Sequence, residues 1–334
     1  MRRLSKDFAR TCASLSRRVS SESCASRFRF EQLGLTLAGL TLAILPMACA
    51  DSPSVAALES DIENNVSSLA LSPSEQTVTA QNEPQTEAAN ADVLNAIINS
   101  QVVYLAENHN SVADHIAQLN IIKTLDETND LAIGLEMFQR PFQSVVDDYL
   151  AGTITEAELV EQSEYETRWG FDWELYAPIL RYAKENQIPV LAMNTPAEAT
   201  RQVAREGLES LQGDLLNYVP PIADIDTTDK DYQASIASVF GAHGHHGNSL
   251  NFDNFFAAQV LWDETMAESI VKQLNADAER QIVVLAGEGH IAFDYGIPNR
   301  VQRRLPDVEQ ASVRLSAADQ PVIPEFTDFV WITP

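Results

Sequence analysis

The chain has 334 residues and a formal net charge of −26, with 45% apolar and 7% aromatic residues. This length suits one or two domains, and the composition is typical of a folded core rather than of a disordered chain. The excess of negative charge argues against a nucleic-acid-binding surface and against a basic face that binds anionic lipid.

The first 50 residues have the features of an export signal. Residues 1–32 contain eight Lys and Arg side chains and three acidic ones, and a weakly polar to apolar run follows at 33–45. That run is shorter than the roughly 20 residues that a membrane-spanning helix needs, so it indicates a targeting segment. Without residues 1–50 the chain keeps 14 basic and 45 acidic residues, a net charge of −31.

The end of this signal allows two maturation routes. Residues 48–50 read Ala-Cys-Ala, with Pro46 upstream, which suits cleavage after Ala50 and soluble release. Alternatively, Cys49 is the lipid-bearing first residue of a lipoprotein, and the protein meets a membrane only through that lipid. All three cysteines lie in the first 50 residues, so the exported body has no disulfide or thiol chemistry.

Residues 51–90 are rich in Ser, Glu, Asn, Gln, Thr and Pro and contain no aromatic residue, which is typical of a disordered linker. In the domain expected at 91–334, helical patterns alternate with short apolar runs. Helices are expected at 91–98, 111–127, 141–150, 155–163, 173–187, over most of 196–218, from about 254, and ending near 306. Strands are expected at 101–106, 131–138, 188–194, 281–290 and 311–316. This alternation predicts an α/β fold, mainly a parallel sheet with helices on both faces.

Two of these strands share the ending Glu-x-His. The first reads "VVYLAENH" at 102–109, and the second reads "VVLAGEGH" at 283–290. Ligands bind at the carboxyl ends of strands in such sheets, and residues two apart on an extended chain point to the same side. We therefore predict that both endings meet at one crevice, each Glu paired with its own His and the pKa of that His raised. The residues concerned are Glu107, His109, Glu288 and His290.

Other polar residues are expected near the same edge. Glu136 and Asn194 end two further strands, although each also suits a helix cap. His115 lies near the start of the helix at 111–127, three residues before Gln118 and on the same helical face. Glu–His pairs can bind a metal ion or transfer protons. Both kinds of chemistry remain open on this evidence.

The sequence "GAHGHHGNS" at 241–249 places three histidines among glycines. It is either a loop with metal- or haem-binding capacity or a solvent loop without a role. The helix that follows carries Gln259 and Asp263 four residues apart on one face. These two side chains either reach the strand ends or bond to the backbone of a neighbouring loop.

From about residue 92 to 315 the chain resembles the ChaN family of the haem-binding uptake, Tiki-like superfamily. The segments that carry the resemblance are "LAENHNSVADHIAQL", "LEMFQRPFQSVVDDYLAG", "FDWELYAPIL", "NTPAEATRQVAREGL", "AAQVLWDETMAE" and "LAGEGHIAFDYGIPNRV". They occur in family order and cover nearly the whole expected domain. One departure is Ala106, where the family usually has Gly before the Glu.

The resemblance implies an iron-regulated haem-binding protein at the cell surface or in the periplasm, often anchored to the outer membrane by lipid. It also implies an α/β fold with an appended helical part and homodimers that share haem. The haem-site residues it implies are Glu107, His109, His115, Glu136, Asn194, Gln259, Asp263 and His290. Family haem ligation uses a tyrosine assisted by histidine, which nominates Tyr176 first and Tyr295 second.

The same resemblance leaves a second class of function open. Related superfamily members are metal-dependent proteases or esterases that use the same Glu and His positions. In that case a divalent metal held by His109 and His290 would activate water, and Glu107 and Glu288 would join them in catalysis.

Overall fold

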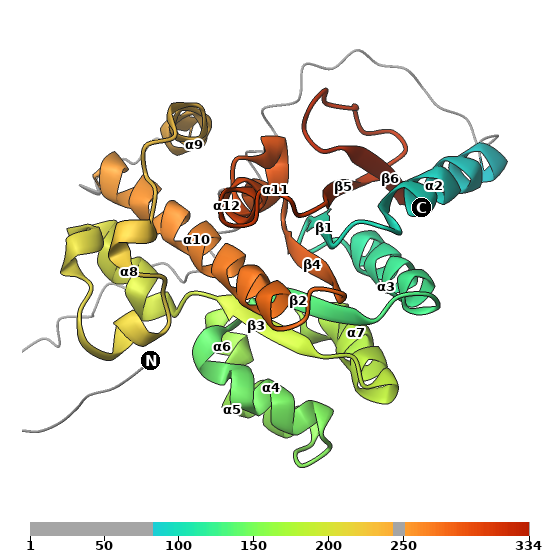
Figure 1. Cartoon of the computed structure of the whole chain (residues 1–334), viewed down its shortest axis with the longest axis horizontal. Coiled ribbons are helices and arrows are strands. Elements are labelled where there is room, and N and C mark those ends of the chain that lie inside the picture. The colour runs from blue at the N-terminus through green and yellow to red at the C-terminus, as the bar shows by residue number, and fades with distance from the viewer. Residues whose placement is uncertain (1–82, 243–250, 334) are drawn as a thin grey trace, which may run out of the picture. The chain divides into compact units, whose positions relative to one another are not determined.

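The computed structural model describes residues 83–242 and 251–333, which are coloured in Figure 1. The predicted export signal, Cys49 included, and the three histidines of segment 241–249 lie outside the described residues. None of the helices within the described ranges is both long enough and apolar enough to cross a membrane.

In the described part of the chain, six strands form one parallel sheet in the order β3-β2-β4-β1-β5-β6. The strands are β1 (Val102–Glu107), β2 (Leu131–Gln139), β3 (Val190–Asn194), β4 (Gln281–Gly287), β5 (Gln310–Ala317) and β6 (Phe329–Thr333). The predicted α/β fold with a parallel sheet is confirmed. Two details differ: β4 ends at Gly287 rather than at residue 290, and β6 was not predicted.

Helices connect these strands. The principal ones are α2 (Glu83–Ile97), α3 (Val112–Asp126), α4 (Gln143–Leu150), α5 (Glu156–Gln162), α6 (Tyr165–Arg168), α7 (Trp173–Asn186), α8 (Ala197–Glu206), α9 (Lys230–Ala242), α10 (Phe252–Ala276), α11 (Glu288–Ile291) and α12 (Ile297–Arg304). Helix α2 includes residues 83–90, so the linker predicted to end at residue 90 is too long. Helix α9 was not predicted, and only the first half of 196–218 is a regular α-helix.

The sheet separates two hydrophobic cores, one on each face (Figure 1). Side chains alternate between the faces along a strand, so Tyr104 and Ala106 of β1 join one core while Val103 and Leu105 join the other. Helices α8, α10 and α12 cover the first face, and α2, α3 and α7 cover the second. Burial of the strands on both faces explains why they are continuous apolar runs in the sequence.

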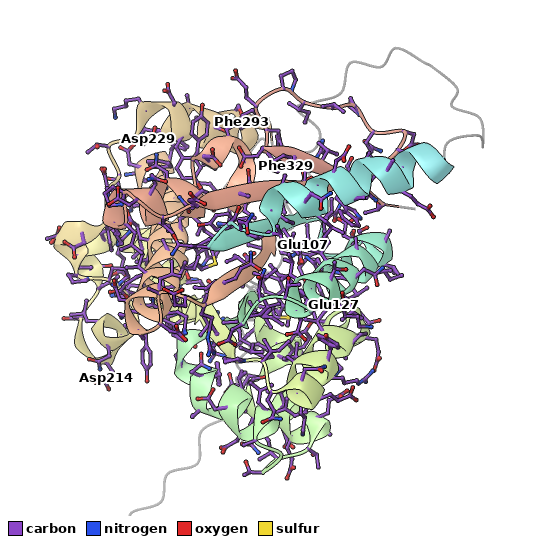
Figure 2. All side chains as sticks on the ribbon, turned by 45° about the vertical axis from the view of Figure 1, so that its right-hand side comes forward. Glu107, Glu127, Asp214, Asp229, Phe293 and Phe329 are labelled. Atoms are coloured by element: carbon purple, nitrogen blue, oxygen red, sulfur yellow. The ribbon has the colours of Figure 1, made fainter. Side chains whose placement is uncertain are left out.

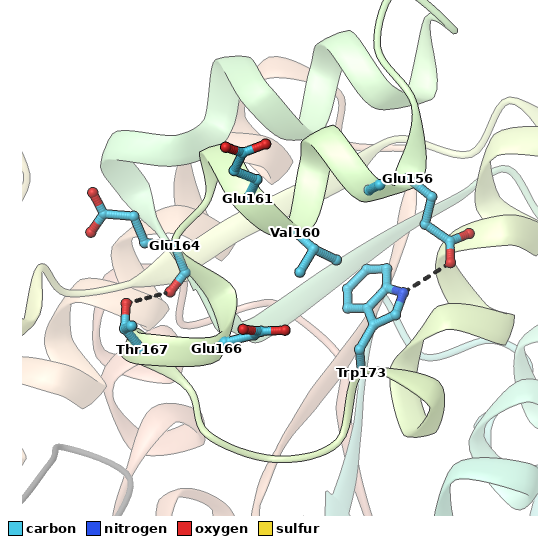
Figure 3. A pocket seen from close by; sticks show the side chains of 8 residues that line it. Glu156, Val160, Glu161, Glu164, Glu166, Thr167 and Trp173 are labelled. Atoms are coloured by element: carbon cyan, nitrogen blue, oxygen red, sulfur yellow. Dashed lines mark hydrogen bonds between the residues drawn. The ribbon is translucent and has the colours of Figure 1, made fainter.

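Helices α4, α5 and α6 form a helical insertion between β2 and α7. Thr155 caps α5 through a reciprocal capping box with Glu158. The indole of Trp173, the first residue of α7, donates a 2.9 Å hydrogen bond to Glu156 at the start of α5 (Figure 3). This bond fixes the insertion against α7, beside a pocket of about 630 Å³ that carries several glutamates.

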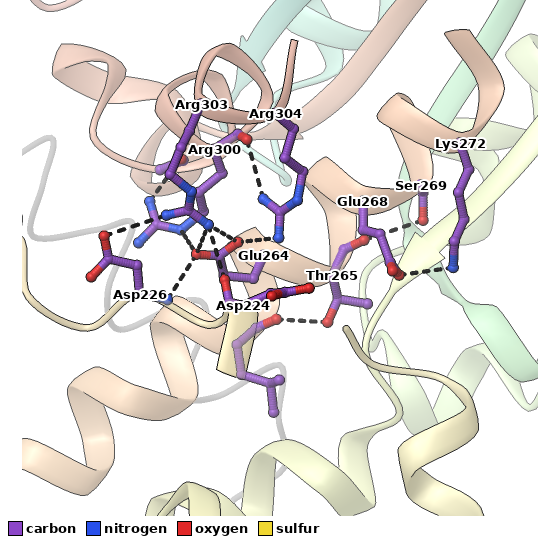
Figure 4. A network of polar contacts seen from close by, with 12 residues as sticks. Asp224, Asp226, Glu264, Thr265, Glu268, Ser269, Lys272, Arg300, Arg303 and Arg304 are labelled. Carbon is purple, nitrogen blue, oxygen red and sulfur yellow. Dashed lines mark hydrogen bonds and ion pairs between the residues drawn. The ribbon is translucent and has the colours of Figure 1, made fainter. Parts of the chain in front are cut away.

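Helices α10 and α12 are joined through the buried carboxylate of Glu264, whose exposed fraction is 0% (Figure 4). Arg303 approaches its two oxygens at 2.7 and 2.8 Å, and Arg304 lies 2.6 Å away. Arg300 adds a contact at 3.5 Å, and the backbone N–H of Asp226 donates a bond of 3.1 Å. One carboxylate of α10 therefore contacts three arginines of α12.

Substitution Glu264→Gln should destabilise the fold strongly. It removes the negative charge that balances the buried guanidinium of Arg300 and the partly exposed ones of Arg303 and Arg304, and a broken buried ion pair costs about 3–5 kcal/mol. Chemical denaturation measures the change. The control is Glu174→Gln, because Glu174 and its partner Arg181 are largely exposed, with side-chain exposures of 66% and 44%. That change should cost at most about 1 kcal/mol. Equal losses for both variants would contradict a structural role of the Glu264 contacts.

Candidate functional site

The candidate site lies where β1, β2 and β4 end. Glu107 is the last residue of β1 and is paired in register with Gly287, the last residue of β4. Its side chain points to the same face of the sheet as those of Val103 and Leu105, where it contacts helices α3 and α7. The side chain of Glu136 in β2 points to the opposite face, and its carboxylate accepts a 2.8 Å bond from the N–H of Gly287. The two glutamates therefore start from opposite faces of the sheet.

Glu107 is surrounded by hydrogen-bond donors. Its Oε1 atom lies 2.6 Å from Nδ1 of His109 and accepts a 2.5 Å bond from the hydroxyl of Tyr176. Its Oε2 atom accepts a bond from the side-chain amide of Gln118 and lies 3.8 Å from Nδ1 of His115. Burial raises the pKa of this carboxyl, but the charge of His115 and the bonds from His109 and Gln118 outweigh burial and lower it to about 2. Glu107 is therefore ionised. These five residues are called the Glu107 group below.

Both ring nitrogens of His115 face oxygen atoms. The amide of Gln118 turns its N–H toward Glu107, so its oxygen faces Nδ1 of His115 at 3.0 Å. The other ring nitrogen, Nε2, lies 3.0 Å from the backbone carbonyl of His109. These contacts hold the ring of His115 in a fixed orientation beside Glu107.

The second set of contacts, the Glu136 group, consists of Glu136, His290, Asp263, Tyr232 and Gln259. Nδ1 of His290 lies 2.6 Å from Asp263, and Nε2 lies 3.2 Å from Glu136. Burial lowers the pKa of His290, but the charges of Glu136 and Asp263 outweigh it and raise the pKa well above its usual range. Burial raises the pKa of Glu136, but His290 and His109 lower it overall. His290 is thus an imidazolium between two carboxylates.

The two groups meet at the carboxyl edge of the sheet. Nε2 of His109 lies 4.0 Å from Oε2 of Glu136. The imidazole of His109 is held edge-on to Trp169, with ring centroids 4.6 Å apart, and lies 4.8 Å from the ring of Phe171. Together they form a rim cluster whose members are all buried, with exposed fractions of 0–4%. Its members are Glu107, His109, His115, Gln118, Glu136, Tyr176, Tyr232, Gln259, Asp263 and His290.

The predicted pairing of Glu288 with His290 is wrong. Residues 288–291 form the helical turn α11, so the two side chains do not share one side of an extended strand. Glu288 instead accepts a 2.7 Å bond from Nε of Arg314 in β5, and both side chains are almost fully buried. The carboxylate partners of His290 are the two in the Glu136 group. The pairing predicted for Glu107 and His109 does form.

The remaining predicted residues have separate outcomes. The amide nitrogen of Gln259 lies 3.2 Å from Nδ1 of His290. Of the two alternatives given for the side chains of α10, the one in which they reach the strand ends is therefore the one observed. Asn194 is buried at the end of β3, where its side chain accepts a bond from the N–H of Thr195, and among the described residues it makes no hydrogen bond with the rim cluster. It does not cap α8 through its side chain.

Sequence reasoning missed two contributors to this region. Tyr232 donates a 2.8 Å bond to Asp263 from α9, and a signal for this helix was present, since Tyr232, Ile236 and Phe240 recur four residues apart in the sequence. Arg314 had a signal: it is a charged residue inside the apolar run of β5, and a buried cation needs a carboxylate partner.

In the ranges that the structure describes, no group of three or more His, Cys, Asp or Glu side chains has a geometry that could hold a metal ion. The expected metal role of His109 and His290 therefore has no support from the arrangement of these side chains.

Comparison with known proteins identifies the family. A family model described as haem-binding uptake, Tiki superfamily, ChaN matches residues 93–301. The chain belongs to this ChaN family. A structure of ChaN from Campylobacter jejuni, described as binding haem cofacially, is 21% identical and has a TM-score of 0.58. The match covers 73% of this chain and 91% of that one, and at this identity it shows a shared fold.

Two other relatives were found, of which one is a much longer protein and the other is less similar to this chain than the C. jejuni structure is. Protein RETICULATA-RELATED 5, chloroplastic, of Arabidopsis thaliana is 25% identical over 265 residues, which are 70% of this chain and 34% of that protein. The chain thus spans about a third of that relative. An erythromycin esterase variant is 17% identical, over 68% of this chain and 72% of that one, with a TM-score of 0.42. A likeness at that score carries no argument about function.

The protonation of His290 in this ChaN-family chain can be tested by ¹⁵N NMR. Both nitrogens of His290 should stay protonated above pH 6.5, because its folded-state pKa is raised. That shift stabilises the fold fully below the unfolded pKa of about 6.5, and the stabilisation is lost as pH rises through the folded value. A neutral His290 with one unprotonated ring nitrogen just above pH 6.5 would contradict the assignment.

Proposed function

We propose that this chain is an exported haem-binding protein that acts in haem and iron acquisition. Membership of the ChaN family supports haem as the ligand. The C. jejuni relative is described as a haem-binding protein and shares the fold. The basic and apolar pattern of residues 1–50 supports export.

The haem surface that fits best is formed by Phe293 and Tyr295 beside α9, rather than by the rim cluster. Haem is a broad planar group, and no rim-cluster residue is more than 4% exposed. Phe293 is 36% exposed and its ring lies 5.7 Å from that of Tyr295 (Figure 2 labels Phe293). The two rings line a pocket of about 350 Å³ whose opposite wall is α9. Exposed aromatic rings of this kind stack well on a flat apolar ligand.

The need for a tyrosine ligand supports the same haem surface. A phenolate ligand suits the ferric iron that haem supplies when it is bound. Burial raises the pKa of Tyr176, the charge of Glu107 raises it further, and the hydroxyl is already donated to that carboxylate. A phenolate at Tyr176 would face a negative charge. Tyr295 is partly exposed and its hydroxyl makes no hydrogen bond with the described residues, so we assign the ligand to Tyr295.

Haem titration of two matched variants tests this assignment. Tyr295→Phe should weaken ferric-haem binding at least tenfold, a change of about 1.4 kcal/mol, and should abolish the phenolate-to-iron charge-transfer band. Tyr176→Phe should bind haem like the unmodified chain, because its ring does not meet the ligand. Both are read by the Soret band and the visible spectrum. If Tyr176→Phe loses the band and Tyr295→Phe keeps it, the haem surface is wrongly assigned. If the unmodified chain binds no haem, the function itself is wrong.

Intact mass spectrometry of the protein from its native host tests export. A mature chain that begins at Asp51 indicates cleavage after Ala50, and a diacylglyceryl group on Cys49 indicates a lipoprotein. Either result supports export and decides between the two routes. A chain that keeps Met1 and residues 2–50 would contradict the proposal.

A further inference from the structure

A third pocket lies between the sheet and α12, on the side of the 292–296 turn that carries Asp294. Its volume is about 570 Å³, within the range of small-molecule sites. Its lining comes from β1, the 292–296 turn, α12, β5 and the residue before β6. The lining residues with polar side chains are Tyr104, Asp294, Asn299, Gln302, Arg303, Gln310, Ser312 and Asp328, and Pro298 and Val308 add apolar walls.

Most of the hydrogen-bond donors in this pocket are already used. Gln310 donates to the carbonyl of Pro298 and to Gln302, and Gln302 donates to the carbonyl of Pro306. The guanidinium of Arg303 is bonded to Glu264 and lies 3.5 Å from Asp226, outside the pocket. The lining therefore offers few free donors to a ligand.

Acceptors, in contrast, remain available. The hydroxyl of Tyr104, a residue with no exposed surface, donates to Gln310 at 2.5 Å and keeps a lone pair for accepting a bond. One oxygen of Asp328 accepts from Ser312, and its other oxygen has no hydrogen bond. The carboxylate of Asp294 makes no hydrogen bond with the described residues. A ligand that satisfies this pocket must donate hydrogen bonds.

The charges in the pocket also favour a ligand that donates hydrogen bonds. Within the described ranges, no Lys, Arg or His nitrogen lies within 4 Å of the carboxylates of Asp294 or Asp328, because Arg303 is paired elsewhere. The pocket walls partly desolvate the otherwise exposed Asp294 and raise its pKa, and the nearby charge of Asp328 adds to this effect. Burial also raises the pKa of Tyr104, and the charge of Asp294 adds to it. A bound cation would relieve the repulsion between these carboxylates.

We propose that this pocket binds a small organic cation with a primary ammonium group on a short alkyl chain. The ammonium group would donate to Asp294, to the free oxygen of Asp328 and to the hydroxyl of Tyr104. The alkyl chain would lie against Pro298 and Val308. This site is additional to haem binding, since Phe293 and Tyr295 line a different pocket on the other side of the same turn.

Calorimetric titration of the full chain without haem tests the proposal, with 1,4-diaminobutane and butylammonium as probes and 1,4-butanediol as the neutral control. The two amines should bind and the diol should not. Asp294→Asn should weaken amine binding at least tenfold. This variant should fold normally, because Asp294 is exposed, makes no hydrogen bond and has a φ of 58°, which asparagine adopts readily. Its melting temperature checks that expectation.

Asp214→Asn is the matched control. It makes the same change in net charge at an exposed residue that lies away from Phe293 in Figure 2. It should leave amine binding unchanged, and so should Tyr295→Phe, which separates this site from the haem surface. Equal binding of the diol, equal weakening by Asp214→Asn, or no amine binding at millimolar concentration would each overturn the proposal. None of these outcomes depends on whether haem binds.

Discussion

The rim cluster depends on one ionised carboxylate, that of Glu107. An ionised carboxylate with almost no access to water is stable only when donors surround it. Here the donors come from the loop after β1, from α3 and from α7, so satisfying one charge fixes three elements at the edge of the sheet. On the α3 side, Nδ1 of His115 lies 3.8 Å from the same carboxylate. The position of α3 relative to α7 is thus set by charge as well as by packing.

Contacts between histidines and carboxylates continue from Glu107 along the edge of the sheet. Histidines and glutamates alternate along it, from His115 through Glu107, His109 and Glu136 to the imidazolium of His290. Each of the two glutamates has a histidine on either side, which lowers its pKa, and the charges of Glu136 and Asp263 raise the pKa of His290. Removing one member would leave its neighbours with unbalanced buried charge, so the cluster is expected to act as a unit.

Much of the fold could be predicted from the sequence, because strands buried on both faces give continuous apolar runs. The meeting of Glu107, His109, Glu136 and His290 at one edge followed as well, since parallel strands end at the same edge, whereas their predicted role in ligand binding stays a prediction. The elements that were missed are stabilised by distant contacts. Strand β6 is held partly by bonds between Ile332 and Asn90, 242 residues apart, and no local pattern reports such a bond. Helix α9 is different, because the spacing of Tyr232, Ile236 and Phe240 is a local helical signal that could have predicted it.

The wrong pairing of Glu288 has a simple geometric origin. The two Glu-x-His endings are 181 residues apart, from Glu107 to Glu288. The strands that carry them pair with a separation of 180, as Val102 with Ile282 shows. A shift of one residue turns a side chain to the other face of a sheet. The repeated motif could therefore never place both glutamates alike. Register is set by packing along the whole strand, and a motif at its end does not reveal it.

The turn at 292–296 shows how the buried cluster and the outer surface are linked. A side chain at Gly296 would place its Cβ atom 2.0 Å from the carbonyl oxygen of His290, so only glycine lets the turn lie this close to α11. Phe293 is held on the other side by a 2.8 Å bond from its N–H to the carbonyl of Phe326. With both ends fixed, left-handed φ angles at Phe293 and Asp294 direct their side chains outward. The backbone that carries an inward-facing histidine thereby also presents an aromatic ring to one pocket and a carboxylate to another.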